Sequence, residues 1–420
     1  MRHRITFFVS LVGVLISVAA SADSDFGGFL VKDGKALFPI GFYELPGDDA
    51  GLRAMADASA NIIRCGSRAD LDRVEAVGML GWVPLPLHTG VTDELRRQVA
   101  ELVDHPALAV WEGPDEVVWN FTAFSGLHKS MGVYENANEW WEQTPRAIEY
   151  SESEAARIIP NMRASAELIR SIDGKRRPVW MNEALRSDAR FVRQYLPFID
   201  VVGCDIYPVK TSDRNIERMG SATDRWMQIA KGKPVWMVLQ AFSWDELGAE
   251  YADRGNAYPA FAESRFMAYD VIAHGARGIM YWGSHYLKSD ACRWSIYSLV
   301  SELAALNSFL VAQDEAGVKL ELIELTDERT GLGVHMIVRR SGEDWLIAIV
   351  NEDGVARMGV EISGLSAIDG RDVMLLYGDE THRVSGGEII VRLQPKEVKV
   401  YCTSRAFESE RREYRDFAGK

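Results

Sequence analysis

Eight short apolar runs between residues 37 and 285 constrain the fold more than any other feature of this 420-residue chain. Most positions in each run are apolar, which is typical of parallel strands that are covered on both faces. Segments with helical patterns, such as DELRRQVAELVD and ESRFMAYDVIAHG, separate the runs. Eight strand–helix units within about 250 residues predict a (β/α)8 barrel. The runs are LFPIGFYE (37–44), NIIRCG (61–66), GWVPLPLH (81–88), ALAVWEG (107–113), PVWMNEA (178–184), DVVGCDIYP (200–208), PVWMVLQAF (234–242) and GIMYWGSH (278–285).

An open, doubly wound sheet is the alternative arrangement of the same elements. Such a sheet usually has a Gly-rich phosphate-binding turn after its first strand. Here the first strand is followed by YELPG at residues 43–47, which lacks that spacing of glycines. The sequence therefore favours the barrel.

After residue 316 the pattern changes to an alternation of apolar and polar residues. Seven segments of this kind, from VKLELIELTD to EVKVYCTS, are separated by Gly, Asn or Asp. They predict the antiparallel strands of a small C-terminal β-sandwich. We therefore expect a barrel domain at 23–316, a β-sandwich domain at 317–404 and a charged tail at 405–420.

The first 22 residues have the features of a secretory signal peptide. Arg2 and Arg4 supply a basic start, residues 5–19 are apolar, and residues 20–22 (ASA) have the small side chains of a cleavage site. A retained membrane anchor is the alternative, but a span needs about 20 apolar residues. The sequence thus predicts a secreted or periplasmic protein with no stable membrane insertion after cleavage.

The net charge bears on the binding partners of the chain, and the cysteine content bears on its disulfides. The chain has 47 Lys and Arg against 61 Asp and Glu, a net charge of -14. This excess argues against nucleic acid or an anionic membrane as a partner. The four cysteines are too few for a disulfide scaffold, and a Cys292–Cys402 bridge is the pairing that the sequence leaves open. The cysteines are Cys65, Cys204, Cys292 and Cys402.

Polar and aromatic residues follow the predicted barrel strands, where the chemistry of such barrels is located. Most distinctive are Asp115 and Glu116, two adjacent carboxyl groups that follow a buried strand and a Gly-Pro corner. Repulsion and burial would raise the pKa of one of them. Glycosidic cleavage needs one protonated and one ionised carboxyl group. The full set of strand-end residues is Arg64, His88, Asp115, Glu116, Glu183, Asp205, Tyr207, Gln240, Trp282 and His285.

The order Arg, His, carboxylate pair, Tyr and Trp resembles that of the large clan of retaining (β/α)8 glycoside hydrolases. This resemblance covers roughly residues 30 to 402, and the clan's barrels often have a companion sandwich. It implies that Glu116 is the general acid/base and that Tyr207 is the tyrosine that hydrogen-bonds the nucleophile. It also implies that Trp282 forms the floor of a sugar subsite, with Arg64 and His88 as supporting polar residues.

Two positions depart from that clan's pattern. Asp115 replaces the Asn before the acid/base, and Gln240 occupies the strand-seven position of the nucleophile. Because Gln is neutral, it cannot form a glycosyl ester. Asp205 would then act as the second carboxylate, for instance as the base of an inverting reaction, or the barrel binds sugar without cutting it. The other candidates for the second carboxylate are Glu183, Asp245 and Glu246.

The segment between the fourth and fifth predicted strands is unusually long and rich in aromatic residues. Long segments of this kind in compact domains are usually functional. We expect its aromatic side chains to line the cleft, with Trp140 and Trp141 stacking on sugar rings. The aromatic residues are Trp119, Phe121, Phe124, Tyr134, Trp140 and Trp141.

The sequence therefore predicts a secreted glycoside hydrolase-like protein that cleaves O-glycosidic bonds in a polysaccharide or oligosaccharide. The expected catalytic residues are Glu116, Asp115 and Asp205. We expect no cofactor and no metal, because no H-x-x-x-H, Cys–His, P-loop or G-x-S-x-G spacing is present. A catalytically silent carbohydrate-binding barrel and a metal-dependent barrel hydrolase are the alternatives. The expected substrate contacts are Arg64, His88, Glu183, Tyr207, Gln240, Trp282, His285 and Trp141.

Overall fold

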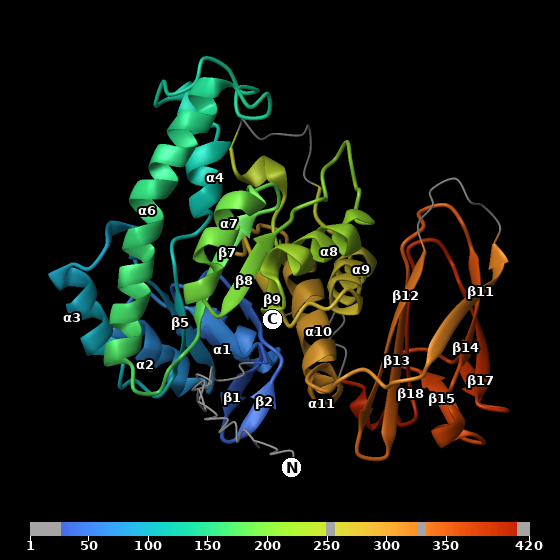
Figure 1. The fold of residues 1–420 in the computed structure, drawn as a ribbon. Helices are drawn as coiled ribbons and strands as arrows, with labels where there is room; N and C mark the ends of the chain where they lie inside the picture. Colours follow the sequence, from blue (N-terminus) through green and yellow to red (C-terminus); the bar gives the residue numbers. More distant parts are fainter. Residues whose placement is uncertain (1–26, 249–256, 326–332, 410–420) are drawn as a thin grey trace, which may run out of the picture.

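The computed structural model describes residues 27–248, 257–325 and 333–409, which form a barrel and a separate pair of antiparallel sheets (Figure 1). This confirms the predicted (β/α)8 barrel followed by a C-terminal β-sandwich. The expected signal peptide, residues 1–22, lies outside the described residues, as does the charged tail from residue 410 onward. Within the part of the chain that is described, no helix has the length and apolar content to cross a membrane.

Eight parallel strands close the barrel, and each overlaps one of the eight apolar runs. Every strand pairs in parallel with its neighbours, and β10 pairs with both β9 and β3 to complete the ring. The carboxyl ends of all eight strands therefore open at one mouth. The strands are β3 (Ile40–Phe42), β4 (Ile62–Arg64), β5 (Leu80–Pro84), β6 (Leu108–Glu112), β7 (Val179–Ala184), β8 (Val201–Asp205), β9 (Val235–Gln240) and β10 (Gly278–Trp282).

Large aromatic side chains fill the inside of the barrel. The ring centroids of Trp82 and Trp180 lie 5.2 Å apart, and those of Trp180 and Trp236 lie 5.3 Å apart. A hairpin of β1 (Leu30–Lys32) and β2 (Lys35–Leu37) precedes the barrel, and Leu30 joins this interior cluster. Because the interior is packed in this way, it offers no pore, and the polar groups gather at the mouth.

Helices surround the barrel, and polar residues cap the first turns of most of them. For example, the Ser67 and Thr92 side chains accept hydrogen bonds from main-chain N–H groups of α2 and α3. The helices are α1 (Asp49–Asp57), α2 (Arg68–Ala76), α3 (Asp93–Leu102), α6 (Pro145–Ile172), α7 (Ala189–Tyr195), α8 (Arg218–Ala230), α9 (Phe261–Ala273), α10 (Asp290–Ala305) and α11 (Asn307–Leu310).

The long aromatic segment after β6 forms α4 (Val117–Thr122) and α5 (Gly126–Lys129) and then packs against the barrel helices. The expectation that all of its rings line the cleft is wrong, because Phe121, Tyr134 and Trp140 are buried. Phe121 and Trp140 both contact Phe191 of α7. These rings form the apolar interface between the segment and the helices. Trp141 is among the few aromatic residues of the segment that remain exposed.

The C-terminal domain is a sandwich of a three-stranded and a five-stranded sheet. All seven predicted strands are present, and the short strand β16 is an addition that the sequence pattern did not indicate. The three-stranded sheet has the order β11 (Lys319–Leu325), β14 (Met358–Ser363) and β17 (Glu388–Leu393). The five-stranded sheet has the order β12 (Val334–Ser341), β13 (Asp344–Asn351), β18 (Val398–Cys402), β15 (Asp372–Leu375) and β16 (Thr381–Arg383).

The five-stranded sheet also packs on the barrel, through α9 and α11 (Figure 1). Its residues Leu346, Ala348 and Val350 join the apolar core of the barrel domain. Arg265 of α9 donates one hydrogen bond to Glu302 and another to the main-chain oxygen of Val398 in β18. The two domains thus share a buried interface.

All four cysteines are buried free thiols. The Cys292–Cys402 disulfide that the sequence left open is therefore absent. Cys292 lies at the start of α10 and Cys402 at the end of β18, and the Cys292 thiol contacts the main-chain oxygen of Pro259 instead. Burial raises the pKa of the Cys292 thiol to about 12, which keeps it protonated.

Candidate active site

Three carboxyl groups converge at the mouth of the barrel around the side chain of Asn182. Asn182 Nδ2 donates to Asp115 Oδ1 at 3.0 Å and to Asp205 Oδ2 at 2.9 Å. Asp205 also shares a hydrogen bond with Glu116. The structure therefore brings together the three residues that were expected to be catalytic, from the loop after β6 and the end of β8.

The main chain at Glu116 is in the left-handed conformation, with φ 49° and ψ 37°. This conformation is uncommon for a residue with a side chain and persists where surrounding contacts impose it. Here the Glu116 N–H donates to the main-chain oxygen of Asn182 at 3.0 Å, and α4 begins directly after Glu116. The strained backbone thus turns the Glu116 side chain toward Asp205.

Burial makes this carboxyl group cluster retain protons. It raises the pKa of Asp205 well above its ordinary value, and the nearby carboxyl groups of Glu116 and Asp115 raise it further. Burial also raises the pKa of Glu116; the hydrogen bond with Asp205 lowers it, and the charge of Asp115 raises it. The pKa of Asp115 is raised by burial as well, against the hydrogen bond from Asn182. A proton shared by Glu116 and Asp205 leaves one group acidic and the other ionised.

A fourth mouth carboxylate, Glu112, was missed in the sequence. It is fully buried at the end of β6, where its Oε2 accepts from Arg64 Nε at 2.7 Å and from Trp82 Nε1 at 3.2 Å. Burial raises its pKa to about 8 in spite of the Arg64 guanidinium. The signal was present, because Glu112 follows the inward-facing Val110 by two residues on a strand.

Aromatic rings form a floor beside the carboxyl groups. The rings of Tyr207 and Trp282 are stacked with centroids 5.4 Å apart, and Phe242 meets both of them edge-on. Trp282 retains partial exposure, as a sugar platform requires. The resemblance had implied a sugar floor at Trp282 and, for Tyr207, a hydrogen bond to the nucleophile. The contacts that the structure shows for the Tyr207 ring are with Trp282, Phe242 and Trp244.

Glu44, another residue that the sequence analysis did not single out, fixes the rim next to Trp282. Its carboxylate accepts from the main-chain N–H groups of Gly283 and Ser284, both at 2.9 Å. His285 Nδ1 lies 3.4 Å from the same carboxylate. Glu44 and His285 also line a hollow at the strand ends of β3 and β10, so His285 is open to a ligand there.

Gln240 is at the predicted strand-seven position, but its side chain is fully buried and binds the main chain. Its Oε1 accepts from Val209 N–H at 2.9 Å, while its Nε2 donates to the oxygens of Val209 at 2.9 Å and Phe242 at 3.0 Å. This use of both ends of the amide requires Gln, because a carboxylate would face two carbonyl oxygens without a donor. Gln240 holds the loop after β8 in place.

Glu183 is fully buried beneath the first turn of α4. Its carboxyl group accepts from the N–H groups of Val118 and Trp119 and from the hydroxyls of Ser187 and Tyr195. These contacts are those of a group that secures a helix start. The geometry therefore favours a structural role for Glu183 over the expected contact with sugar.

His88 and Trp141 lie apart from the carboxyl group cluster. His88 is in a short turn against α6, where Asn161 donates to its main-chain oxygen, and burial and the Arg157 charge lower its pKa. Trp141 is 46% exposed, with its ring near the guanidinium of Arg186. The ring centroid of Trp141 also lies 6.2 Å from that of Trp119 in α4.

No protein-family model matches the sequence, and no curated protein shows significant similarity to it. Solved structures do match. An arabinofuranosidase is 10% identical with a TM-score of 0.51, over 89% of this chain and 93% of that chain. The barrel and sandwich are thus similar to a glycoside hydrolase fold.

Two β-galactosidase structures are more distant in geometry. That of Bacillus circulans sp. alkalophilus is 9% identical with a TM-score of 0.48, over 88% of this chain and 99% of that chain. That of the psychrophilic Marinomonas ef1 is 13% identical with a TM-score of 0.44, over 64% of this chain. This chain spans only 60% of the length of the Marinomonas enzyme.

Proposed function

We propose that this protein is a secreted or periplasmic glycoside hydrolase that cleaves O-glycosidic bonds in a polysaccharide or oligosaccharide. The observation that carries the proposal is the proton-sharing cluster of Asp115, Glu116 and Asp205, placed beside the Tyr207–Trp282 floor. Glycosidic cleavage uses one protonated and one ionised carboxyl group beside a bound sugar. The similarity of the fold to an arabinofuranosidase supports the same conclusion.

In this proposal Glu116 donates the proton to the leaving oxygen. Its raised pKa keeps it protonated at a higher pH than an exposed glutamate, and Asp115 maintains that shift. In the free protein the hydrogen bond between Glu116 and Asp205 raises the pKa of Asp205 and lowers that of Glu116, so Asp205 holds the shared proton. The sugar enters between the two groups and breaks this bond, which favours transfer of the proton to Glu116. Asp205 is then ionised and acts at the anomeric carbon, either directly or through a water molecule.

Asp205 takes this role because Gln240 cannot. The Gln240 amide is fully engaged with the main chain, which leaves the strand-seven nucleophile position of the clan without a carboxylate. Glu116 and Asp205 share a hydrogen bond in the free protein, so a bound sugar must move them apart to the separation of about 5–5.5 Å of a retaining pair or about 6.5–9.5 Å of an inverting pair.

Replacement of Glu116 by Gln tests the proposal. General acid–base catalysis contributes about 10²–10⁴-fold, so E116Q should lose that factor on unactivated glycosides. Nitrophenyl glycosides should lose much less, since their leaving group departs with little protonation. Activity is measured by reducing-sugar release, and E75Q, an exposed glutamate of α2, is the control. Full activity of E116Q on a natural glycan would refute the assignment.

A carbohydrate-binding barrel without hydrolysis is the second candidate function, and the engaged Gln240 amide favours it. A panel of glycans separates the two candidates when hydrolysis and binding are measured on the same protein. Binding without product for any glycan, with D205N binding as well as the wild type, would establish the silent barrel. Product formation that D205N abolishes would establish the hydrolase.

A further inference from the structure

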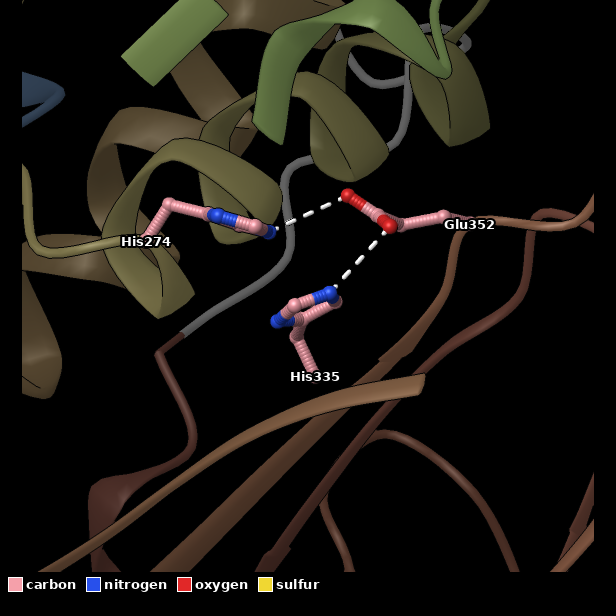
Figure 2. A group of neighbouring side chains, drawn as sticks. All are labelled: His274, His335 and Glu352. Carbon is pink, nitrogen blue, oxygen red and sulfur yellow. Dashed lines mark hydrogen bonds and ion pairs between the residues drawn. The ribbon is translucent and has the colours of Figure 1, made fainter. Parts of the chain in front are cut away.

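Two histidines and a glutamate meet where the barrel and the sandwich join (Figure 2). His274 ends α9 of the barrel, His335 is in β12, and Glu352 follows β13. His274 Nε2 lies 3.1 Å from Glu352 Oε1, and His335 Nε2 lies 3.2 Å from Glu352 Oε2. Their possible ligand atoms all lie within 4.8 Å of one another.

Asp270 lies next to the cluster on the same helix, one turn before His274. It is fully buried, and its Oδ1 has no hydrogen-bond partner in the described chain. This oxygen lies 3.9 Å from His274 Nε2, while Asp270 Oδ2 accepts from the N–H of Gly220. A buried carboxylate oxygen without a donor is costly, and a cation bound by the neighbouring side chains would lower that cost.

The orientation of His274 matches that of a metal ligand. Its Nδ1 lies 2.9 Å from Asp224 Oδ1, so that nitrogen can donate to Asp224 while Nε2 faces the cluster as a ligand atom for a cation. A carboxylate on the far nitrogen is the usual support of a metal-bound histidine. The rings of His274 and His335 have centroids 3.9 Å apart, so both imidazoles lie at the same point of the junction.

The backbone of α8 also leaves room for the cluster. A Cβ atom on Gly220 would lie 2.1 Å from Glu352 Oε1 and 2.5 Å from His274 Nε2, so no other residue fits without moving them. Glycine within a helix costs about 0.5–1 kcal/mol relative to alanine. The close approach of Glu352 and His274 to the backbone therefore explains why residue 220 is glycine.

We propose that His274, His335 and Glu352 bind one Zn²⁺ ion that links the barrel to the sandwich. Zinc takes nitrogen ligands at about 2.0–2.1 Å and carboxylate oxygens at about 2.0–2.2 Å, so adjacent ligand atoms in a tetrahedron lie roughly 3.3 Å apart. The 3.1 Å and 3.2 Å separations fit that geometry. Two imidazoles favour zinc over calcium, which prefers oxygen ligands.

This site is independent of the proposed sugar chemistry, because its three ligands lie at the domain junction and not in the carboxyl group cluster at the mouth. Access is available, since the His335 side chain is 40% exposed while those of His274 and Glu352 are 5% and 6% exposed. The sequence did not indicate the site because His335 and Glu352 are far along the chain from α9.

Metal titration of the whole protein tests the proposal. The chain is treated with a chelator, dialysed and titrated with zinc sulfate alone, with binding measured by calorimetry and metal content by mass spectrometry. We expect one zinc per chain and a rise of a few degrees in melting temperature, with no rise for calcium at the same concentration. Absence of zinc binding, or an equal rise with calcium, would overturn the proposal.

Three variants locate the ion. H335A changes a half-exposed side chain and E352Q keeps the shape of Glu352, so both should fold and yet bind zinc at least tenfold more weakly. H128A, on α5, is the matched control and should bind as the wild type does. Unchanged zinc affinity in both H335A and E352Q would show that zinc binds elsewhere, for example at His105, Asp72 and Glu75, and would refute the site.

Discussion

Single residues decide which chemistry the mouth of the barrel can perform. Asp115 and Gln240 are the two positions that differ from the glycoside hydrolase pattern, and each has a physical role in the structure. The Asp115 charge raises the pKa of Glu116, while the Gln240 amide binds the main chain of Val209 and Phe242. Both roles lead to measurable expectations.

Replacing Asp115 with Asn should move the basic limb of the kcat/KM profile to lower pH. The proton donor must be protonated to work, so activity falls as pH rises through the pKa of Glu116. The Asp115 charge raises that pKa, so its removal lowers it, and the donor is lost at lower pH. Profiles of D115N and wild type on the same glycoside measure the shift. A limb that stays in place or moves upward would contradict this role.

Replacing Gln240 with Glu should lower stability without creating a nucleophile. The new carboxylate would face the oxygens of Val209 and Phe242, and leaving buried polar groups without partners costs about 1–3 kcal/mol. Thermal unfolding and glycoside hydrolysis are measured together. A gain in hydrolysis at unchanged melting temperature would show that residue 240 reaches the substrate after all.

At the scale of elements, α4 and the segment that follows it support the site. Glu183 beneath the first turn of α4 fixes the helix whose start is Glu116. The buried rings of the segment pack it on α7, so the loop is a rigid part of the barrel wall. The two adjacent tryptophans of this segment differ in burial: Trp140 is packed in the barrel wall, whereas Trp141 is exposed.

Trp140 and Trp141 should respond oppositely to replacement by Ala. Trp140 is 2% exposed, and truncation of a buried Trp costs about 3–5 kcal/mol. Trp141 is 46% exposed, so W141A should keep its melting temperature and weaken only the binding of glycans. Thermal unfolding and glycan titration of both variants provide the comparison. A stable W140A, or an unstable W141A, would contradict the packing described here.

At the scale of the whole molecule, the sandwich packs against helices of the barrel domain and shares their apolar core. Its five-stranded sheet shares an apolar core with α9 and α11, and Arg265 connects Glu302 to β18 across the junction. Such a shared interface favours unfolding of the two domains in a single transition.

Arg265→Ala should destabilise the protein far more than Arg157→Ala. Both arginines make short ion pairs, 2.7 Å to Glu302 and 2.6 Å to Glu154. The Arg265 pair is 12% and 1% exposed, whereas Arg157 is 59% exposed. Breaking a buried pair costs about 3–5 kcal/mol, and an exposed pair contributes about 0–1 kcal/mol. Equal melting temperatures in the two variants would show that the junction does not stabilise the chain.

The sequence by itself determined the eight barrel strands, seven of the sandwich strands and their order. The eight apolar runs predicted the barrel strands because continuous apolar segments separated by helices can be buried only between two layers. Alternation after residue 316 predicted the sandwich in the same way. The position of Asp115 and Glu116 after a strand placed them at the mouth, since all parallel strands end on one side.

Only the tertiary structure decided what each strand-end side chain contacts. Glu183 and Glu116 follow apolar strands alike, yet Glu183 bonds Val118, 65 residues away, and is buried. Gln240 bonds Val209, 31 residues away, and Glu352 meets His274 at a separation of 78. Local patterns report which face of an element is apolar, but contacts between distant residues depend on how the elements pack. The roles of these side chains were therefore fixed by packing and not by spacing.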